Sequence, residues 1–153
     1  MKRLPVLALS LAAAVTAGAA PYGGAVLALY KSSENQTEKE NEIYYYLSSP
    51  LKELGLAVRY WDIDKGLPDA KAMQDVRALV SWFRGPALAE PEAYLEYLER
   101  LMDSGTKVVV FDNFGAYQNR QTQAYLEASR INLTLGRLGL LYLGDWTEDA
   151  SVI

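Results

Sequence analysis

The chain has no cysteine and no histidine among its 153 residues. Without a thiol or an imidazole it offers no disulfide, no cysteine nucleophile, no Ser-His-Asp triad and no histidine-ligated metal site. After the N-terminus, no apolar run is long enough to cross a bilayer. EF-hand spacing is missing too, although an all-carboxylate calcium site stays open as an alternative. We therefore expect no cofactor and no metal.

The N-terminus has the three parts of a secretory signal peptide. Lys2 and Arg3 form a basic start, residues 4–15 are apolar, and the small residues 17–19 form a cleavage site. We predict a signal peptide over residues 1–19 and one domain over residues 20–153, with a retained N-terminal anchor as the alternative. The protein is expected to be exported, periplasmic or extracellular, with no membrane span after cleavage.

Acidic residues outnumber basic ones. The whole chain has 15 Lys and Arg against 19 Asp and Glu, a net charge of -4, and loss of Lys2 and Arg3 leaves 13 against 19, or -6. An acidic domain without a basic stripe argues against binding to nucleic acid or to an anionic membrane. An exported chain without disulfides fits a bacterial periplasmic protein better than a eukaryotic secreted one.

Apolar runs alternate with segments of helical spacing. Strands are predicted at residues 25–30, 57–63, 76–83 and 108–111, and a fifth begins at 140–143. A first helix has Thr37 as its N-cap, is broken or restarted at Pro50, and ends at Gly55. Further helices are predicted, a short one at 69–74, the clearest at 91–104 before Gly105, and a long one at 121–138 before Gly139.

This order predicts an α/β fold, a flavodoxin-like or Rossmann-like three-layer sandwich with a mostly parallel sheet of about five strands. The sequence ends soon after the fifth predicted strand begins. Two interpretations stay open: the N-terminal part of a longer protein, or a small complete domain.

Candidate site residues follow the predicted strands, because ligands of open α/β sheets bind at the carboxyl ends of the strands. Asp112 and Asn113 precede a turn at Gly115 and could bind a sugar hydroxyl or a substrate amide. The alternative is that they only stabilise the turn. The first strand is followed by Ser32 and Glu34, which could contact a glycan or form a solvated linker.

Aromatic residues are frequent near the other predicted strand ends. Trp82 and Arg84 could form a stacking platform with a carboxylate clamp, or a core residue and a surface cap. Eleven tyrosines, among them residues 44–46 and Tyr97, favour a glycan or protein surface. Asp62 and Asp112 are the one pair considered for acid/base catalysis, and the sequence does not supply their separation.

Five sequence blocks carry a resemblance to known proteins. They are VLALY (26–30), SPLKELGL (49–56), YWDIDKGLP (60–68), VSWFR (80–84) and DNFGAY (112–117). These blocks resemble the class I glutamine amidotransferase-like superfamily, a flavodoxin-like fold, and within it the N-terminal region of secreted exopolysaccharide-processing proteins of the PelA type. The family's G-x-C-x-G nucleophile turn falls on residues 111–115, where Asn113 replaces the cysteine.

The resemblance implies a catalytically inactive, amidotransferase-like domain. The leading hypothesis is an exported, non-catalytic domain that binds or positions polysaccharide, or a partner domain, through Asp112, Asn113, Trp82, Arg84 and the loop after the first strand. The second hypothesis is a carboxylate-based glycoside hydrolase, and the third is a periplasmic scaffold for a protein partner. Whether the protein is an enzyme is therefore left open, with the absences favouring no activity.

Overall fold

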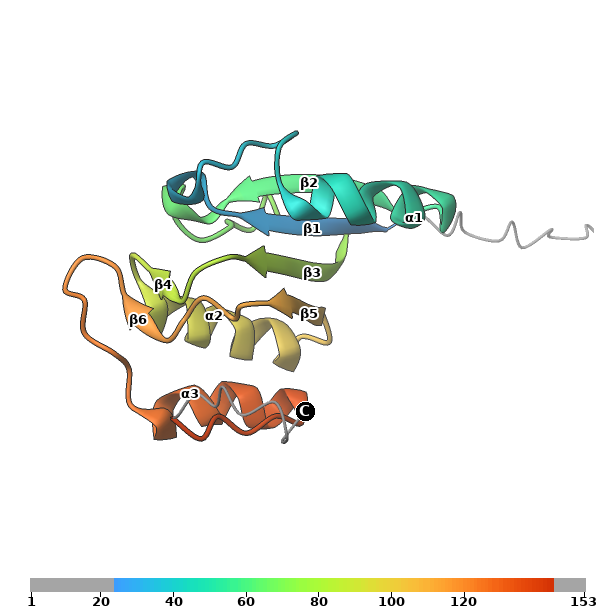
Figure 1. Ribbon diagram of the computed structural model, residues 1–153. Coiled ribbons are helices and arrows are strands. Elements are labelled where there is room, and N and C mark those ends of the chain that lie inside the picture. Colours follow the sequence, from blue (N-terminus) through green and yellow to red (C-terminus); the bar gives the residue numbers. More distant parts are fainter. Residues whose placement is uncertain (1–23, 145–153) are drawn as a thin grey trace, which may run out of the picture.

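A four-stranded parallel sheet organises the structure, a computed structural model that describes residues 24–144 (Figure 1). The strand order is β2-β1-β3-β5. The strands are β1 (Ala25–Tyr30), β2 (Ala57–Asp62), β3 (Val76–Phe83) and β5 (Lys107–Asp112). The predicted α/β class with a parallel sheet is confirmed, and the four strands lie where the apolar runs placed them.

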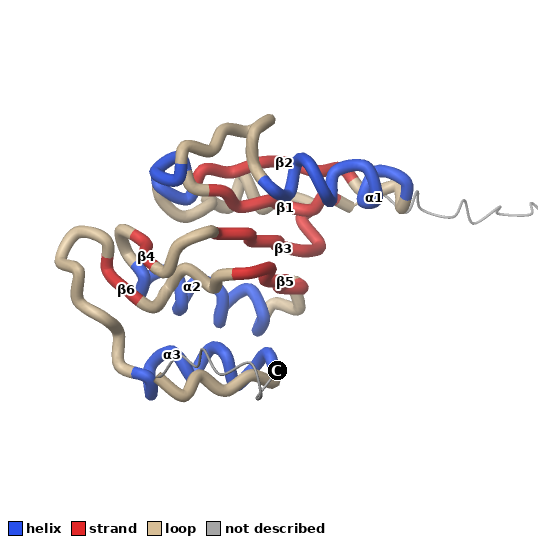
Figure 2. Tube along the Cα trace, viewed as in Figure 1, coloured by secondary structure: helices blue, strands red, loops and turns tan. Residues whose placement is uncertain are grey.

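Helices cover both faces of this sheet, so the domain has three layers (Figure 2). One face carries α2 (Pro91–Asp103), against which α3 (Ala128–Leu135) packs. Across β1 and β2, the other face carries a π-helical turn (Ile43–Leu47) that continues as α1 (Ser48–Glu53). A second, two-stranded parallel sheet, β4 (Ala87–Leu88) with β6 (Gln118–Asn119), lies beyond the carboxyl ends of the main strands.

Alternation along the strands divides the apolar side chains between two cores. The core under α2 and α3 is the larger one, and it includes Leu27, Leu29, Leu79, Phe83, Tyr94, Leu98 and Ile131. The core under α1 is small, with Val26, Ala28, Ile43 and Val80 buried. The α1 layer is therefore thin, and Trp82 and Phe111 on that face stay partly exposed.

The first helix departs from prediction at its start. Asn41, not Thr37, caps it, because the Asn41 Oδ1 accepts from the backbone N of Tyr44 at 2.9 Å. Thr37 instead pairs with Glu40 in a preceding turn. The predicted restart at Pro50 fits the change from π to α geometry, since Pro50 lies in the first turn of α1, where its missing N–H is tolerated.

Two predicted elements near the C-terminus are wrong for local reasons. The long helix begins only at Ala128, because the Asn119 side chain accepts from the backbone N of Gln121 and Thr122 and holds a turn there. No strand forms at 140–143, because the Asn132 side chain bonds both the N and the O of Tyr142 and so replaces a strand partner. The main sheet therefore has four strands, not five.

The predicted short helix at residues 69–74 is also wrong. Those residues form hydrogen-bonded turns. Asp75, which connects them to β3, has a left-handed φ of 60°. A helix of this length has little stability of its own unless an apolar face is packed.

Residues 1–23 and 145–153 lie outside the described part, so the signal peptide stays a prediction. Between residues 24 and 144, none of the helices has the length and apolar character that a membrane span requires.

Gly115 is a position where glycine is required twice over. Its φ is +82°, and a Cβ there would lie 2.4 Å from the Phe83 ring. Gly105 shares the left-handed φ, +83°, but a Cβ there would meet nothing within 4 Å. We expect Gly105→Ala to cost about 1 kcal/mol of unfolding free energy, and Gly115→Ala about 3 kcal/mol, measured by urea denaturation. Equal losses of unfolding free energy in the two variants would mean that the Phe83 ring can move aside for the added methyl group.

Candidate functional site

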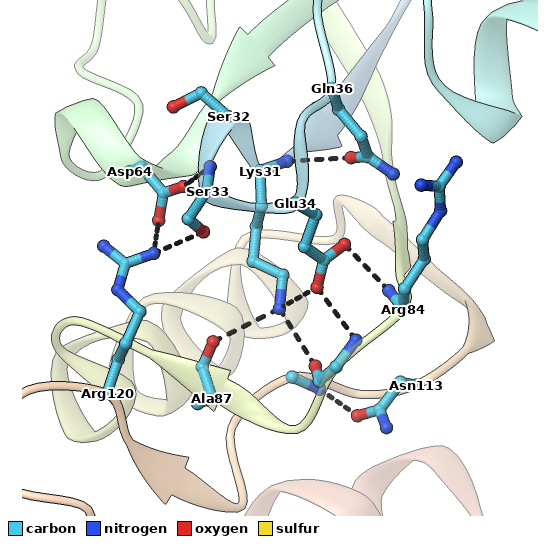
Figure 3. Close-up of polar contacts among 12 residues, drawn as sticks. Lys31, Ser32, Ser33, Glu34, Gln36, Asp64, Arg84, Ala87, Asn113 and Arg120 are labelled. Atoms are coloured by element: carbon cyan, nitrogen blue, oxygen red, sulfur yellow. Dashed lines mark hydrogen bonds and ion pairs between the residues drawn. The ribbon is translucent and has the colours of Figure 1, made fainter.

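The carboxyl edge of the sheet contains the place where flavodoxin-like folds bind ligands. With the order β2-β1-β3-β5, the chain reverses direction across the sheet between β1 and β3, and this is the position where open α/β sheets bind ligands, here called the β1/β3 crevice. The first residue after β1 is Lys31, and the segment after β3 begins at Arg84. The side chains that fill this β1/β3 crevice come from those two segments (Figure 3).

Lys31 occupies the crevice and is 2% exposed. Its Nζ lies 2.5 Å from Glu34 Oε1 and donates to the carbonyl oxygens of Gly85 at 2.9 Å and Ala87 at 3.2 Å. It also lies 5.0 Å from the centroid of the Phe83 ring. An ammonium has three donors, and all three have an acceptor here. Lys31 is thus fully committed inside the protein.

Glu34 completes this arrangement. Its Oε2 accepts from the backbone N of Arg84 at 2.9 Å, and its Oε1 accepts from the backbone N of Gly85 at 2.8 Å. Gly85 therefore gives its carbonyl to Lys31 and its N–H to Glu34. We call Lys31, Glu34 and Gly85 the Lys31 clamp. It joins the segments after β1 and β3 at the position where open α/β sheets bind ligands.

A second contact network extends the clamp toward the π-helical turn. Arg84 donates from Nε to Glu42 Oε1 at 2.6 Å, and its second nitrogen lies 2.5 Å from the same oxygen. Gln36 donates to Glu42 Oε2 at 2.6 Å and accepts from the backbone N of Lys31 at 3.0 Å. Arg84 was expected to hold a ligand carboxylate, and the structure gives it a carboxylate from the protein itself.

A third contact crosses the opposite side of the edge. Asp64, just after β2, accepts from the backbone N of Ser33 at 2.7 Å and from the guanidinium of Arg120. Arg120 also donates to the Ser33 hydroxyl. Burial raises the pKa of Asp64, but the Ser33 hydrogen bonds and Arg120 outweigh it, so this pKa lies below its ordinary value. Three segments distant in the sequence meet at this carboxylate.

Asp62 and Asp112, the predicted acid/base pair, lie at opposite edges of the sheet. Asp62 ends β2, is buried, and accepts from the backbone N of Ser32 and Asp64 at 3.1 and 3.2 Å. Asp112 ends β5 and is exposed. Three strand spacings separate their backbones by roughly 14 Å, whereas glycosidase carboxyl groups lie about 5 to 9.5 Å apart.

Asn113 has a turn role in the structure. Its Oδ1 accepts from the backbone N of Gly115 at 2.9 Å, and its own N donates to the Phe83 carbonyl at 3.2 Å. Asp112 before it adopts a left-handed φ of 56°. The interpretation of this stretch as turn chemistry therefore accounts for the observed contacts of Asn113.

Trp82 belongs to a row of rings on the thinly covered face. Its ring stacks on Phe111 across the β3–β5 pair, with centroids 5.0 Å apart and planes 17° apart. On its other side Tyr46 lies 5.7 Å away, and this tyrosine is 65% exposed. We call Tyr46, Trp82 and Phe111 the aromatic row. Trp82 therefore lies among other rings outside the β1/β3 crevice, and its predicted role in a stacking platform with Arg84 stays a prediction.

Sequence reasoning missed five residues that build the edge. They are Lys31, Gln36, Glu42, Asp64 and Arg120. Lys31 and Glu34 had a detectable signal, a lysine immediately after a buried strand with a carboxylate three residues later. Arg120 and Glu42 had none, because their partners lie 56 and 42 residues away.

Comparisons with protein-family models, with curated proteins and with solved structures find no match for this chain. The resemblance to amidotransferase-like proteins therefore stays a prediction. Among residues 24–144, no three potential metal-ligating side chains gather into one group.

Removal of Lys31 tests the clamp. We expect Lys31→Met to lower the free energy of unfolding by about 3–5 kcal/mol, because it leaves Glu34 without its cation. Lys65→Met is the matched control. Lys65 is also three residues from its carboxylate partner, Asp62, but its side chain is 77% exposed and its Nζ lies 3.6 Å from the Asp62 carboxylate. Its removal should cost less than about 0.5 kcal/mol. Similar losses in both variants, measured by urea denaturation, would contradict a special role for Lys31.

The lowered pKa of Asp64 predicts a pH dependence. A carboxyl group whose pKa is depressed by folding adds stability above its unfolded pKa, which is 3.8, and that stability is lost as the pH falls through the folded pKa. Asp64→Asn should therefore be less stable than wild type at neutral pH, and the difference should shrink below about pH 4. Thermal unfolding across this range measures it, with Glu96→Gln as an exposed control. A constant difference would contradict the assignment.

Proposed function

We propose that this protein is a non-catalytic binding domain that holds a polysaccharide against its aromatic row. The observation that carries the proposal is the row itself, three neighbouring rings of which Tyr46 is largely exposed and Trp82 and Phe111 are partly exposed. Aromatic rings offer a large, rigid apolar surface at little cost in side-chain entropy. Such surfaces suit the apolar faces of sugar rings.

Polar groups next to the row support a sugar ligand in particular. Arg84 follows Trp82 by two residues, and Glu42 precedes Tyr46 by four, so the Arg84–Glu42 ion pair joins the same two segments as the Tyr46–Trp82 ring pair. Arg84 remains 55% exposed in this pair. Its remaining N–H donors and the Glu42 carboxylate can bond sugar hydroxyls at the border of an apolar surface.

The filled crevice supports binding without turnover. Lys31 and Glu34 each have protein partners for their charged atoms, and the separation of Asp62 and Asp112 gives the hydrolase alternative no support. In the resemblance to amidotransferases, the nucleophile position is that of Asn113, whose amide oxygen is committed to Gly115. Export to the cell envelope, where such polysaccharides occur, rests on the predicted signal peptide.

A protein-binding scaffold is the second candidate, and one observation favours it. Tyr45 is 62% exposed beside Tyr46, and β5 ends the sheet with Val109 partly exposed on the thinly covered face. Exposed tyrosines and an exposed sheet edge are both surfaces that proteins use for association.

Tyr46 and Tyr45 form a matched pair of variants. We expect Tyr46→Ala to raise the Kd for a bound polysaccharide about tenfold, because truncation of an aromatic anchor commonly costs more than about 1 kcal/mol. Tyr45→Ala removes an equally exposed ring outside the row, so it should leave Kd almost unchanged. Isothermal titration calorimetry with dextran, chitosan and alginate covers neutral, cationic and anionic chains.

Two results would count against the proposal. If none of the three classes of polysaccharide binds, the glycan function is unsupported and the scaffold becomes the better candidate. If Tyr45→Ala and Tyr46→Ala weaken binding equally, the aromatic row is not the binding surface.

A further inference from the structure

A separate cavity of about 310 Å³ opens at the carboxyl edge of the sheet. Its walls are the turn after β2 (residues 63–67), the segment around β4 (88–90), the first turn of α2 and Gln121. Ile63, Leu67, Leu88 and Tyr94 line it with apolar surface. This volume is near the lower limit for ligand pockets, about 300 Å³, and suits a single ring.

Fixed contacts hold the walls of this cavity in place. The ion pair between Asp64 and Arg120 joins the turn after β2 to the segment after β6. Trp61 donates its indole N–H to the Gly66 carbonyl at 2.8 Å, and the backbone N of Gln121 donates to Asn119 Oδ1 at 2.9 Å. The cavity is therefore formed before any ligand arrives, which lowers the entropic cost of binding.

Polar groups at the cavity rim have unused hydrogen-bonding capacity. Within residues 24–144, the Glu90 carboxylate and the Gln121 side-chain amide make no hydrogen bond or ion pair, and Lys65 has only its 3.6 Å contact with Asp62. Lys31 is the opposite case, with every donor satisfied. At the rim, Lys65 donates hydrogen bonds, the Glu90 carboxylate accepts them, and the Gln121 amide does both.

The charges at the rim favour neither an anion nor a cation. Glu90 and Lys65 have opposite charges, and Asp64 is already paired with Arg120, so the rim has no net charge that would attract an ionic ligand. A ring with an apolar face and hydroxyl groups around its border satisfies both the walls and the rim. We propose that this cavity binds one neutral, polyhydroxylated ring of pyranose size, a second sugar subsite apart from the aromatic row; this rests on the proposed glycan function.

Two tryptophan indoles report on the two sites separately. The Trp61 N–H is bonded to Gly66 at the cavity, whereas Trp82 belongs to the aromatic row. We would titrate the ¹⁵N-labelled full chain with methyl glucoside, with glucuronate and glucosamine as charged counterparts, and follow both indole signals by NMR. The neutral glycoside should shift the Trp61 and Gly66 signals with a saturable, millimolar Kd, and the charged sugars should bind more weakly.

Glu90→Ala should raise that Kd about fivefold, the factor for the loss of one hydrogen bond. Glu96→Ala is the matched control, a glutamate in α2 whose side chain is 63% exposed and pairs only with Arg100. Because Glu90 precedes α2 and is exposed, its replacement should leave the fold intact, which the unchanged remaining spectrum would verify.

The outcomes separate this proposal from the function on which it rests. Shifts confined to Trp82, or equal Kd values for Glu90→Ala and wild type, would overturn the cavity subsite and leave the aromatic row as the sugar site. If neither indole responds to any sugar and the polysaccharides do not bind, both proposals fail. A tighter complex with glucuronate or glucosamine than with the neutral glycoside would overturn the neutral assignment.

Discussion

The buried ammonium of Lys31 is the constraint on which the arrangement of the carboxyl edge depends. A charge taken out of water is stable only if its attraction to partners replaces its hydration. Lys31 meets this condition with one carboxylate and two carbonyls, which belong to Gly85 in the segment between β3 and β4 and to Ala87, the first residue of β4. The path of that segment is therefore fixed by the lysine. Because β4 forms one wall of the neighbouring cavity and pairs with β6, the clamp also determines the position of Arg120 and of the chain around it.

In flavodoxin-like folds, a crevice between β1 and β3 is usually open to a ligand. The buried lysine separates the position of this crevice from its availability. The crevice between β1 and β3 is in its expected place, but protein side chains occupy it. The two surfaces that we propose for ligands flank this crevice: the aromatic row on the thinly covered sheet face and the cavity beside β4. Within residues 24–144, Lys31 is the one buried lysine, and beside Phe83 it leaves the centre of this edge filled by the protein itself.

The strands could be predicted from the sequence because each is a short apolar run whose stability comes from burial, a property that the run itself records. The same reasoning failed where a single side chain decides the backbone, as Asn119 does for the start of α3 and Asn132 for the segment near Tyr142. At the site, Glu34 was proposed because it follows a strand, and Trp82 because it lies near the end of one. Arg120 and Glu42 were not, because their roles arise from contacts across the fold, and no local pattern encodes such contacts.

The Lys31 clamp also has a consequence for the order in which the chain assembles. Its carbonyl acceptors are 54 and 56 residues away from Lys31. Closing a loop of that length costs chain entropy before any contact forms, so these bonds can appear only after β3 has reached its place beside β1. Until then Lys31 keeps its hydration, and the segment after β1 is held only by contacts such as those of Ser32 and Ser33 with Asp62 and Asp64. We therefore expect the clamp to form late, once the central pair of strands has joined in the correct register.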